Sequence, residues 1–224
     1  MWYPNDGSEE WLSRSDAELC IKLALLSNPK CTVAEIGVWK GAWTSVLLKN
    51  VVDSVVIGVD PYPNCIEEKE VMVGRMNRLK LEKRFSLFKS IDDIPRSFSF
   101  DLVHVDGVHT EQQVYQDLSK ISQRLNDWGI MVVDDYNDYW FPGVQSGLYK
   151  FIHEGKFRIF LVSPQKAYIT TKNHAPKLWE LLYSLKNDFK YSSIYKNWAD
   201  AYPMYRYLQE SDVLGQPILI CSPK

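Results

Sequence analysis

The sequence lacks a strong net charge and any long apolar run. Its 224 residues hold 26 Lys and Arg against 28 Asp and Glu, which gives a formal net charge of −2. Phosphate binding needs clustered positive charge, so this balance predicts no nucleic-acid partner. No apolar run approaches the ~20 residues that a membrane-spanning helix requires. We therefore expect neither a nucleic-acid nor a membrane partner.

Cysteines are also scarce, and no two of them are close together in the sequence. Cys20, Cys31, Cys65 and Cys221 are scattered and form no C-x-x-C motif. This spacing disfavours both a zinc site and a disulfide framework. The first ten residues are acidic and lack the charged and apolar regions of a signal peptide. We expect a cytoplasmic protein with reduced thiols.

Residues 33–60 give the clearest indication of the fold. In order, they read as a strand at Val33–Ile36, glycines at Gly37 and Gly41, a helix at Ala42–Lys49, a strand at Val55–Val59, and Asp60. The apolar runs predict buried strands, and the apolar spacing between them predicts a helix. This order predicts one right-handed crossover unit with two parallel strands.

The glycine turn of this unit favours a nucleoside ligand. Its sequence, E-I-G-V-W-K-G, lacks the middle glycine of the dinucleotide motif G-x-G-x-x-G. Glu35 also disfavours a bound pyrophosphate, because an acid repels phosphate. The helix beginning near Gly41 directs free N–H groups at the turn, and Asp60 is placed to accept hydrogen bonds from a ribose. S-adenosylmethionine has both a ribose and a positive charge. A glycine turn without any ligand remains the alternative.

E-I-G-V-W-K-G followed by V-I-G-V-D resembles motifs I and II of the class I S-adenosylmethionine-dependent methyltransferases. The resemblance implies that Glu35, Gly37 and Gly41 surround the methionine part of the cofactor and that Asp60 holds its ribose. It implies an α/β fold: a Rossmann-like three-layer sandwich with a mostly parallel seven-stranded sheet and one antiparallel strand near the C-terminus. In this family the loop after the third strand contacts adenine. Ser90 and Ile91 are therefore candidates, with an ordinary polar loop as the alternative.

The rest of the chain continues this alternation of helices and strands. Apolar spacing and turn residues predict helices at 66–83, 144–153 and 176–185, and strands at 85–88, 100–106, 130–133, 157–162 and 167–171. A capping box at Thr110 and Gln113 starts another helix, whose stripe runs to Leu125 and which Gly129 ends. We expect a single domain, 1–224, with an N-terminal helical cap (1–32), a cofactor-binding core (33–172) and a C-terminal aromatic extension (173–224).

Three carboxylates follow two neighbouring predicted strands. Asp106 ends the fourth strand, and Asp134 and Asp135 end the fifth. Such strand ends face the ligand crevice of a parallel sheet, where converging acids repel one another unless a cation neutralises them. Oxygen ligands favour a hard divalent cation, Mg²⁺ first. The alternative is that these acids only cap strands and helices.

The pattern H-V-D-G-V-H, followed by a helix and a strand ending D-D-Y, resembles the metal-dependent O-methyltransferases of the macrocin type, methyltransferase domain family 24. The resemblance implies that Asp106, Asp134 and Asp135 bind Mg²⁺ and places Asp106 among the cofactor contacts. It also implies that His109 is the general base, the alternative being a residue that orients a ligand acid. His104 is more typical of a satisfied core histidine.

Together these features predict a metal-dependent O-methyltransferase for a small hydroxylated acceptor, such as a sugar or a glycosylated natural product. The aromatics Trp198, Tyr202, Tyr205 and Tyr207 are candidates for stacking on acceptor rings, or for core and interface packing. Two other functions stay open: an inactive binding or assembly protein with this fold, and a nicotinamide oxidoreductase. Methylation of N or C and homo-oligomerisation are also left open.

Overall fold

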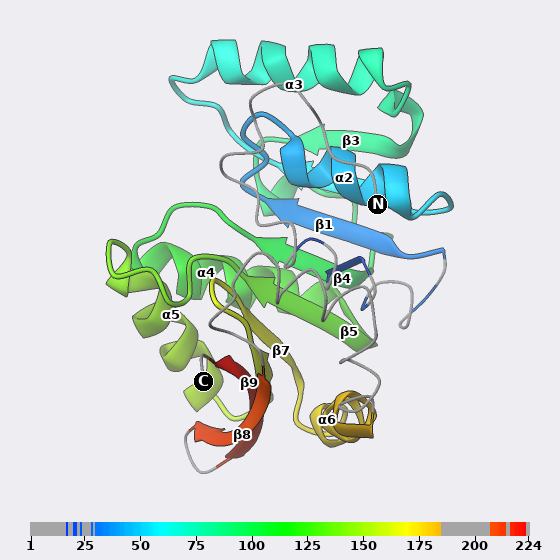
Figure 1. Ribbon diagram of the computed structural model, residues 1–224. Helices are drawn as coiled ribbons and strands as arrows, with labels where there is room; N and C mark the ends of the chain where they lie inside the picture. Colours follow the sequence, from blue (N-terminus) through cyan, green and yellow to red (C-terminus); the bar gives the residue numbers. More distant parts are fainter. Residues whose placement is uncertain are drawn as a thin grey trace.

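The computed structural model of the chain describes residues 17, 20, 21, 23, 28, 30–184, 207–213 and 216–222. Within this part, one mixed sheet has the strand order β3-β2-β1-β4-β5-β7-β6-β9-β8 (Figure 1). Its strands are β1 (Thr32–Ile36), β2 (Val55–Val59), β3 (Phe85–Phe88), β4 (Phe100–Val105), β5 (Leu125–Val133), β6 (Phe157–Val162), β7 (Ala167–Thr171), β8 (Tyr207–Val213) and β9 (Gln216–Ser222).

The helices alternate with the strands, as the sequence predicts. They are α2 (Ala42–Asn50), α3 (Ile66–Arg78), α4 (Glu111–Ile121), α5 (Pro142–His153) and α6 (Ala175–Ser184). The Thr110 hydroxyl accepts the N–H of Gln113 and caps α4, which confirms that helix start. Pro142 occupies the first turn of α5, where its missing N–H costs no hydrogen bond.

The first seven strands form the expected Rossmann-like sheet. β3, β2, β1, β4 and β5 are parallel, and β7 lies antiparallel between β5 and β6. This arrangement confirms the predicted α/β fold with one antiparallel strand near the end of the seven. The strands β9 and β8 extend the sheet beyond β6, β9 parallel to β6 and β8 antiparallel to β9. The sequence did not predict this extension.

Two hydrophobic layers cover the sheet, which makes the three-layer sandwich. One layer joins α2, α3 and α6 to strand residues such as Val33 and Val132. The other joins the neighbouring helices α4 and α5 to the alternate strand residues, such as Ala34 and Val133 (Figure 1). Side chains alternate along a strand, so Glu35 and His104 point toward the layer of α2. The pairing of β1 with β4 sets these two residues opposite each other.

The prediction of the α4 end was wrong. We expected Leu125 in the helical stripe and a break at Gly129, but α4 ends at Ile121, a short 3-10 turn follows, and β5 already begins at Leu125. A Cβ on Gly129 would lie 2.5 Å from Leu125 Cγ and 2.9 Å from the Phe100 carbonyl oxygen. The glycine therefore permits close packing inside the strand, beside an irregularity in the pairing of β4 with β5.

Backbone hydrogen bonds join the chain just beyond the strands at the carboxyl edge of the sheet. Gly37 N–H donates to Val59, Asp60 N–H to Phe88, Asp106 N–H to Ile36 and Asp134 N–H to Val105, at 2.8–3.0 Å. Each of these residues therefore stays in register with its neighbouring strand. The glycine turn and the acids that follow β2, β4 and β5 are held along one line.

Some expectations fall outside the described residues. They include Trp198, Tyr202 and Tyr205, and the side chains of Tyr207 and Cys221. Among the residues described, Cys20 and Cys31 are buried and Cys65 is partly exposed, and none of the three forms a disulfide. None of the described helices is both long and apolar enough to cross a membrane. The domain boundaries stay a prediction.

Candidate functional site

The glycine turn packs tightly against the end of β4. Gly37 has a φ of +86°, a conformation that favours glycine. A Cβ there would overlap the carbonyl oxygen of Asp106 and lie 2.6 Å from its carbonyl carbon. The missing side chain thus admits the backbone of Asp106 rather than leaving room for a ligand. The turn and the carboxylate cluster are in direct contact.

Asp60 holds the glycine turn in place. Its Oδ2 accepts the backbone N–H groups of Val38 at 3.1 Å and Trp39 at 2.9 Å, and its Oδ1 accepts the N–H of Tyr62 at 2.9 Å. The Tyr62 hydroxyl donates to the Trp39 carbonyl oxygen. Asp60 is only half-buried, and each carboxylate oxygen has two acceptor sites, so a ribose hydroxyl would compete with few of these bonds.

Gly41 starts α2 in the left-handed conformation, with a φ of +71°. A Cβ there would lie 2.8 Å from Met72 Cγ and 3.0 Å from Met76 Cε. Glycine therefore lets α3 pack against the first turn of α2. No side-chain oxygen caps this end of α2. Its free N–H groups and its partial positive charge suit an electron-rich ligand group.

Glu35 is buried beneath α2. Its carboxylate accepts a hydrogen bond from the Thr44 hydroxyl, and Oε1 lies 3.8 Å from His104 Nδ1. The His104 ring is stacked on Trp43, with ring centroids 4.3 Å apart. Burial raises the pKa of Glu35. The Glu35 carboxylate is enclosed in the interior, where its partners are Thr44 and His104. Its predicted effect on the methionine part of the cofactor would therefore be indirect, through the glycine turn that lies over it.

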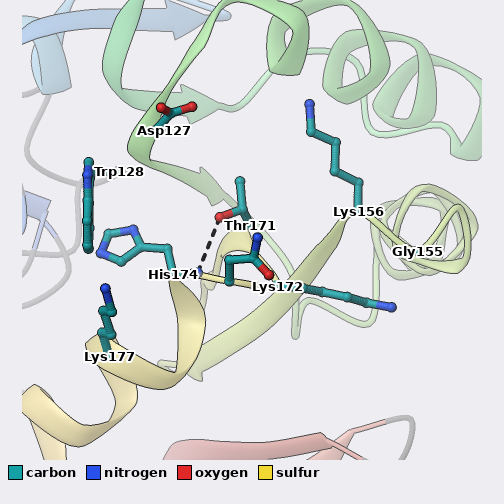
Figure 2. Close-up of a pocket in the computed structure, with 9 residues that line it drawn as sticks. Asp127, Trp128, Gly155, Lys156, Thr171, Lys172, His174 and Lys177 are labelled. Carbon is teal, nitrogen blue, oxygen red and sulfur yellow. Dashed lines mark hydrogen bonds between the residues drawn. The ribbon is translucent and has the colours of Figure 1, made fainter.

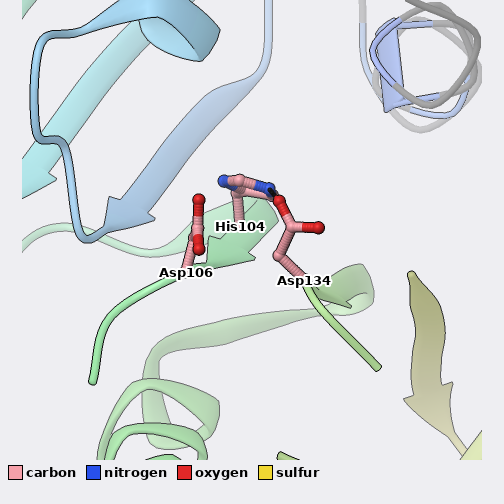
Figure 3. A group of neighbouring side chains, drawn as sticks. All are labelled: His104, Asp106 and Asp134. Atoms are coloured by element: carbon pink, nitrogen blue, oxygen red, sulfur yellow. Dashed lines mark ion pairs between the residues drawn. The ribbon is translucent and has the colours of Figure 1, made fainter. Parts of the chain in front are cut away.

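Asp134 is paired with a buried lysine that the sequence reading missed. Lys166, in the turn between β6 and β7, forms an ion pair with Asp134 Oδ2, and its side chain is 3% exposed. His104 Nε2 lies 3.2 Å from the same oxygen (Figure 3). Burial alone would raise the pKa of Asp134, but the Lys166 ammonium and the His104 N–H hold it well below its ordinary value.

Asp106 and Asp135 face His109 on the more open side of the cluster. His109 Nε2 lies 3.3 Å from Asp106 Oδ1 and 3.4 Å from Asp135 Oδ2. Asp135 has a φ of +54°, an uncommon conformation for a residue other than glycine. One donor atom from each of Asp106, His109 and Asp135 lies within 4.8 Å of the others. This spacing suits a single bound cation.

The charges of this group shift its titrations. Burial, together with the charges of Asp134 and Asp106, raises the pKa of Asp135 to about 6. The hydrogen bond that His109 donates to the Asp106 carboxylate raises the pKa of His109, against the opposing effect of burial. Both shifts show that the cluster carries excess negative charge, which a proton or a metal cation would relieve.

α5 fixes the position of His109. The Phe141 ring, just before α5, lies against the His109 ring with centroids 4.3 Å apart. A Cβ on Gly143 would lie 2.5 Å from the His109 carbonyl oxygen, so the start of α5 presses on the backbone of His109. The imidazole is held from two sides while its Nε2 faces the acids.

The two predicted adenine contacts, Ser90 and Ile91, lie in different environments. Ser90 caps a 3-10 turn at Ile91–Asp93, its hydroxyl accepting the Asp92 N–H at 3.2 Å. Ile91 is buried with Ile57, Val59 and Ile94 in the layer of α4 and α5. Ile91 packs in the core, and Ser90 lies just beyond β3. Their contact with adenine stays a prediction.

An aromatic pair beside the acids was also missed. Tyr139 and Trp140 follow β5, are 80% and 71% exposed, and have ring centroids 4.9 Å apart. The Asp138 carboxylate accepts a hydrogen bond from the backbone N–H of Trp140. The signal was present in the run Y-N-D-Y-W-F-P-G directly after Asp134 and Asp135.

A separate cavity of about 670 Å³ lies toward the opposite end of the strands (Figure 2). It is lined by Trp128 in the first half of β5, by His174 and by lysines such as Lys172 and Lys177. Lys177 lies over the Trp128 ring, 4.6 Å from its centroid. The cavity shares no lining residue with the acid cluster, so we assign it no part in the chemistry at Asp106 and Asp135.

Comparison with known families agrees with this geometry. Residues 34–136 match the family model Methyltransf_24, described as a methyltransferase domain. The matched span contains the glycine turn, Asp60, His109 and all three acids. A protein of Acanthamoeba polyphaga mimivirus, "Uncharacterized protein R132", is 30% identical over 135 residues. That match spans 54% of this chain and 59% of the viral protein.

Solved methyltransferases share the fold. The S-adenosylhomocysteine-bound methyltransferase PaMTH1 of Podospora anserina has a TM-score of 0.59 at 16% identity, over 75% of this chain and 82% of its own. An O-methyltransferase of Bacillus cereus in complex with S-adenosylhomocysteine has a TM-score of 0.56 at 13% identity, over 70% and 80%. TomG of Streptomyces achromogenes, in complex with S-adenosylmethionine, has a TM-score of 0.53 at 16% identity, over 76% and 92%.

The matched domain and the shared fold support an S-adenosylmethionine-dependent methyltransferase of class I. They agree with the class that the turn E-I-G-V-W-K-G and the acid at Asp60 predict. The macrocin type, the metal and the acceptor are finer assignments, and they depend on the residues of this chain.

Proposed function

We propose that this protein is an S-adenosylmethionine-dependent O-methyltransferase that uses a divalent cation. The observation that carries the proposal is the direct contact between the glycine turn at Gly37 and the backbone of Asp106. A cofactor bound along the turn would present its methyl group beside the acids and His109. Two solved O-methyltransferases of this fold, from Bacillus cereus and Streptomyces achromogenes, are complexes with S-adenosylhomocysteine and S-adenosylmethionine, which supports the assignment.

The proposed cation site is the cluster of Asp106, Asp134 and Asp135. Its fit rests on one carboxylate oxygen each from Asp106 and Asp135, which lie within 4.8 Å of each other and belong to partly exposed side chains. Mg²⁺ commonly keeps several waters and takes one or two carboxylates, so this partly open group suits it or Mn²⁺. When bound, the cation would polarise the acceptor hydroxyl and lower its pKa.

His109 is the proposed general base. A proton taken at Nε2 would lie between the carboxylates of Asp106 and Asp135, which stabilise the imidazolium. The ring contact with Phe141 and the packing of Gly143 hold the imidazole in that direction. Positioning the base and the acceptor together reduces the entropic cost of the transfer.

The proposed acceptor is a small hydroxylated ring compound, such as a sugar or a glycosylated natural product. The exposed pair Tyr139 and Trp140 stands in the same loop as Asp135 and supports this choice, because sugar and aromatic rings stack on aromatic side chains. The loop also carries Phe141, which touches His109. An acceptor ring stacked on the pair would therefore lie close to the base.

The test is a methyl-transfer assay with S-adenosylmethionine, Mg²⁺ and a panel of sugars, glycosides, nucleotide sugars and catechols, read by mass spectrometry. We expect one acceptor class to gain a single methyl group, and EDTA to abolish the gain. The His109→Ala variant should lose about 10²–10⁴-fold in turnover. His153→Ala, an exposed histidine at the end of α5, is the matched control and should keep full activity.

Contrary results are distinct from one another. Full activity in EDTA would contradict the metal, and a loss below threefold in His109→Ala would contradict the base. Binding of S-adenosylhomocysteine without transfer to any acceptor would favour an inactive binding protein. Quenching of NADH fluorescence in place of cofactor binding would favour a nicotinamide enzyme.

A further inference from the structure

Both oxygens of Asp134 already have donors from the protein itself. Oδ2 forms the ion pair with Lys166 and lies 3.2 Å from His104 Nε2. Oδ1 accepts the backbone N–H of Asp135 at 2.9 Å. The side chain is 14% exposed, against 36% for Asp106 and 25% for Asp135. A cation binding Asp134 would compete with the Lys166 ammonium and His104 at Oδ2, and at Oδ1 it would find only the acceptor site that the Asp135 N–H leaves open.

The fold keeps Lys166 in this place. The turn between β6 and β7 closes with the Ser163 N–H donating to the Lys166 carbonyl oxygen at 2.8 Å and the Lys166 N–H donating to the Ser163 hydroxyl at 3.2 Å. Asn137, which follows Asp135, donates its side-chain N–H to the Ser163 carbonyl oxygen at 3.0 Å. The lysine backbone is thus tied to the loop of the acids. Its buried ammonium needs an anionic partner, because a buried unpaired charge is strongly destabilising.

The formal charges of the acid cluster also agree with a pairing of Lys166 and Asp134. With both histidines neutral, the three carboxylates and the Lys166 ammonium leave two negative charges, which one divalent cation would match. Those two charges belong to Asp106 and Asp135, whose facing oxygens converge on His109 Nε2. Two carboxylates with several waters form a sufficient site for Mg²⁺ or Mn²⁺.

We infer that Lys166 is the permanent counter-ion of Asp134, and that the exchangeable divalent cation is bound by Asp106 and Asp135 alone among the three acids. This inference rests on the proposed metal dependence and narrows its ligand set. Lys166 is then a positioning residue: it holds Asp134 away from the metal and fixes the net charge that the metal meets. Asp134 anchors the β6–β7 turn to the site.

The test measures Mn²⁺ binding directly, by the electron paramagnetic resonance signal of free Mn²⁺, on the full chain with S-adenosylhomocysteine present. The double variant Asp134→Asn/Lys166→Met removes the ion pair without changing the net charge. We expect its Kd for Mn²⁺ to stay within threefold of the wild type. Asp106→Asn and Asp135→Asn should each raise that Kd at least tenfold.

A matched control is available in the exposed ion pair of Lys120 with Asp92, 2.5 Å apart and remote from the cluster in sequence. The double variant Asp92→Asn/Lys120→Met should leave the Kd unchanged. If Asp134→Asn/Lys166→Met weakens Mn²⁺ binding as much as Asp135→Asn does, the inference is overturned while the proposed metal dependence stands. A wild-type protein that binds S-adenosylhomocysteine but no Mn²⁺ overturns both.

A measurement on the wild type covers the case in which the double variant does not fold. Crystals soaked in Mn²⁺ should show an anomalous peak in contact with Asp106 and Asp135, with Lys166 Nζ still on Asp134. A peak bonded directly to an oxygen of Asp134, with the lysine displaced, would refute the inference. This readout needs neither a substitution nor a known acceptor.

Discussion

The Trp43 indole and the His104 imidazole lie face to face, with ring centroids 4.3 Å apart and planes 5° from parallel. Stacking fixes the imidazole so that one nitrogen faces Glu35 and the other faces Asp134. His104 thereby joins the acid under the glycine turn to the acid after β5. The sequence suggested a satisfied core histidine, and the structure agrees that it is buried while showing that its partners belong to the candidate site.

Replacing His104 with Leu should destabilise the fold. The variant removes the imidazole that lies 3.2 Å from Asp134 and 3.8 Å from Glu35, and a hydrogen bond to a charged group contributes about 1.5–3 kcal/mol, although each carboxylate keeps its other donors. Urea unfolding followed by tryptophan fluorescence measures the free energy of unfolding. The exposed His153→Leu should change it by less than about 0.5 kcal/mol. Equal effects of the two substitutions would show that the buried imidazole has no special role.

Gly37→Ala should be strongly destabilising, because the added Cβ would overlap the Asp106 carbonyl group and the φ of +86° is unfavourable for alanine. We expect a loss of about 3 kcal/mol or more in the free energy of unfolding, in the range of the most damaging substitutions. Gly74→Ala is the matched control. Gly74 is exposed in α3 with nothing within 4 Å of its added Cβ, so alanine should stabilise the helix by about 1 kcal/mol. Circular dichroism in urea distinguishes the two, and a Gly37→Ala protein as stable as wild type would contradict the packing.

Local patterns in the sequence predicted much of the fold. The apolar runs of β1, β2, β3, β6 and β7 match the structure closely because each is short and bounded by turn residues, and all but β3 are largely buried. The α4–β5 boundary failed because Leu125 fits both a helical stripe and a strand, and only pairing with β4 decides between them. The β8–β9 hairpin follows an aromatic segment that showed no clear period, so no local signal marked it.

The sequence predicted the site residues that directly follow strands. It did not predict contacts between residues that are far apart in the sequence. Asp60, Asp106, Asp134 and Asp135 follow strands, so a parallel sheet brings them to one edge. Lys166 comes from a hairpin turn some thirty residues after Asp134, and no short motif links the two. The buried position of Ile91 likewise depends on packing against α4 and α5, which a loop sequence does not reveal.

Asp60→Ala should weaken binding of S-adenosylhomocysteine. The substitution removes the proposed ribose acceptor and also the carboxylate that holds the N–H groups of Val38 and Trp39. Hydrogen bonds to a charged group contribute about 1.5–3 kcal/mol, so we expect Kd to rise roughly 10- to 100-fold. Isothermal titration calorimetry measures it. Asp53→Ala, at an exposed acid before β2, is the control and should bind as the wild type does. Unchanged affinity in Asp60→Ala would remove the ribose assignment.

Asp117 in α4 gives the protein a pH-dependent instability. Its carboxyl group is buried, with one hydrogen bond from the Gln113 side chain at 2.9 Å, and burial raises its pKa. The folded protein therefore keeps this proton at pH values where the unfolded chain has lost it. The free energy of unfolding therefore falls as pH rises above about 4, the ordinary pKa of an Asp side chain. The fall ends at the pH where Asp117 ionises in the folded protein as well.

Asp117→Asn should remove this loss, because asparagine does not titrate and its side-chain oxygen can still accept from Gln113. The variant should gain stability over the wild type as pH rises above about 4, and the gain should level off once the folded carboxyl group has also ionised. Urea unfolding at several pH values measures both curves. The exposed Asp53→Asn, which has no such burial, should run parallel to the wild type. If the Asp117→Asn curve also runs parallel, the buried carboxyl group titrates normally and the predicted shift is wrong.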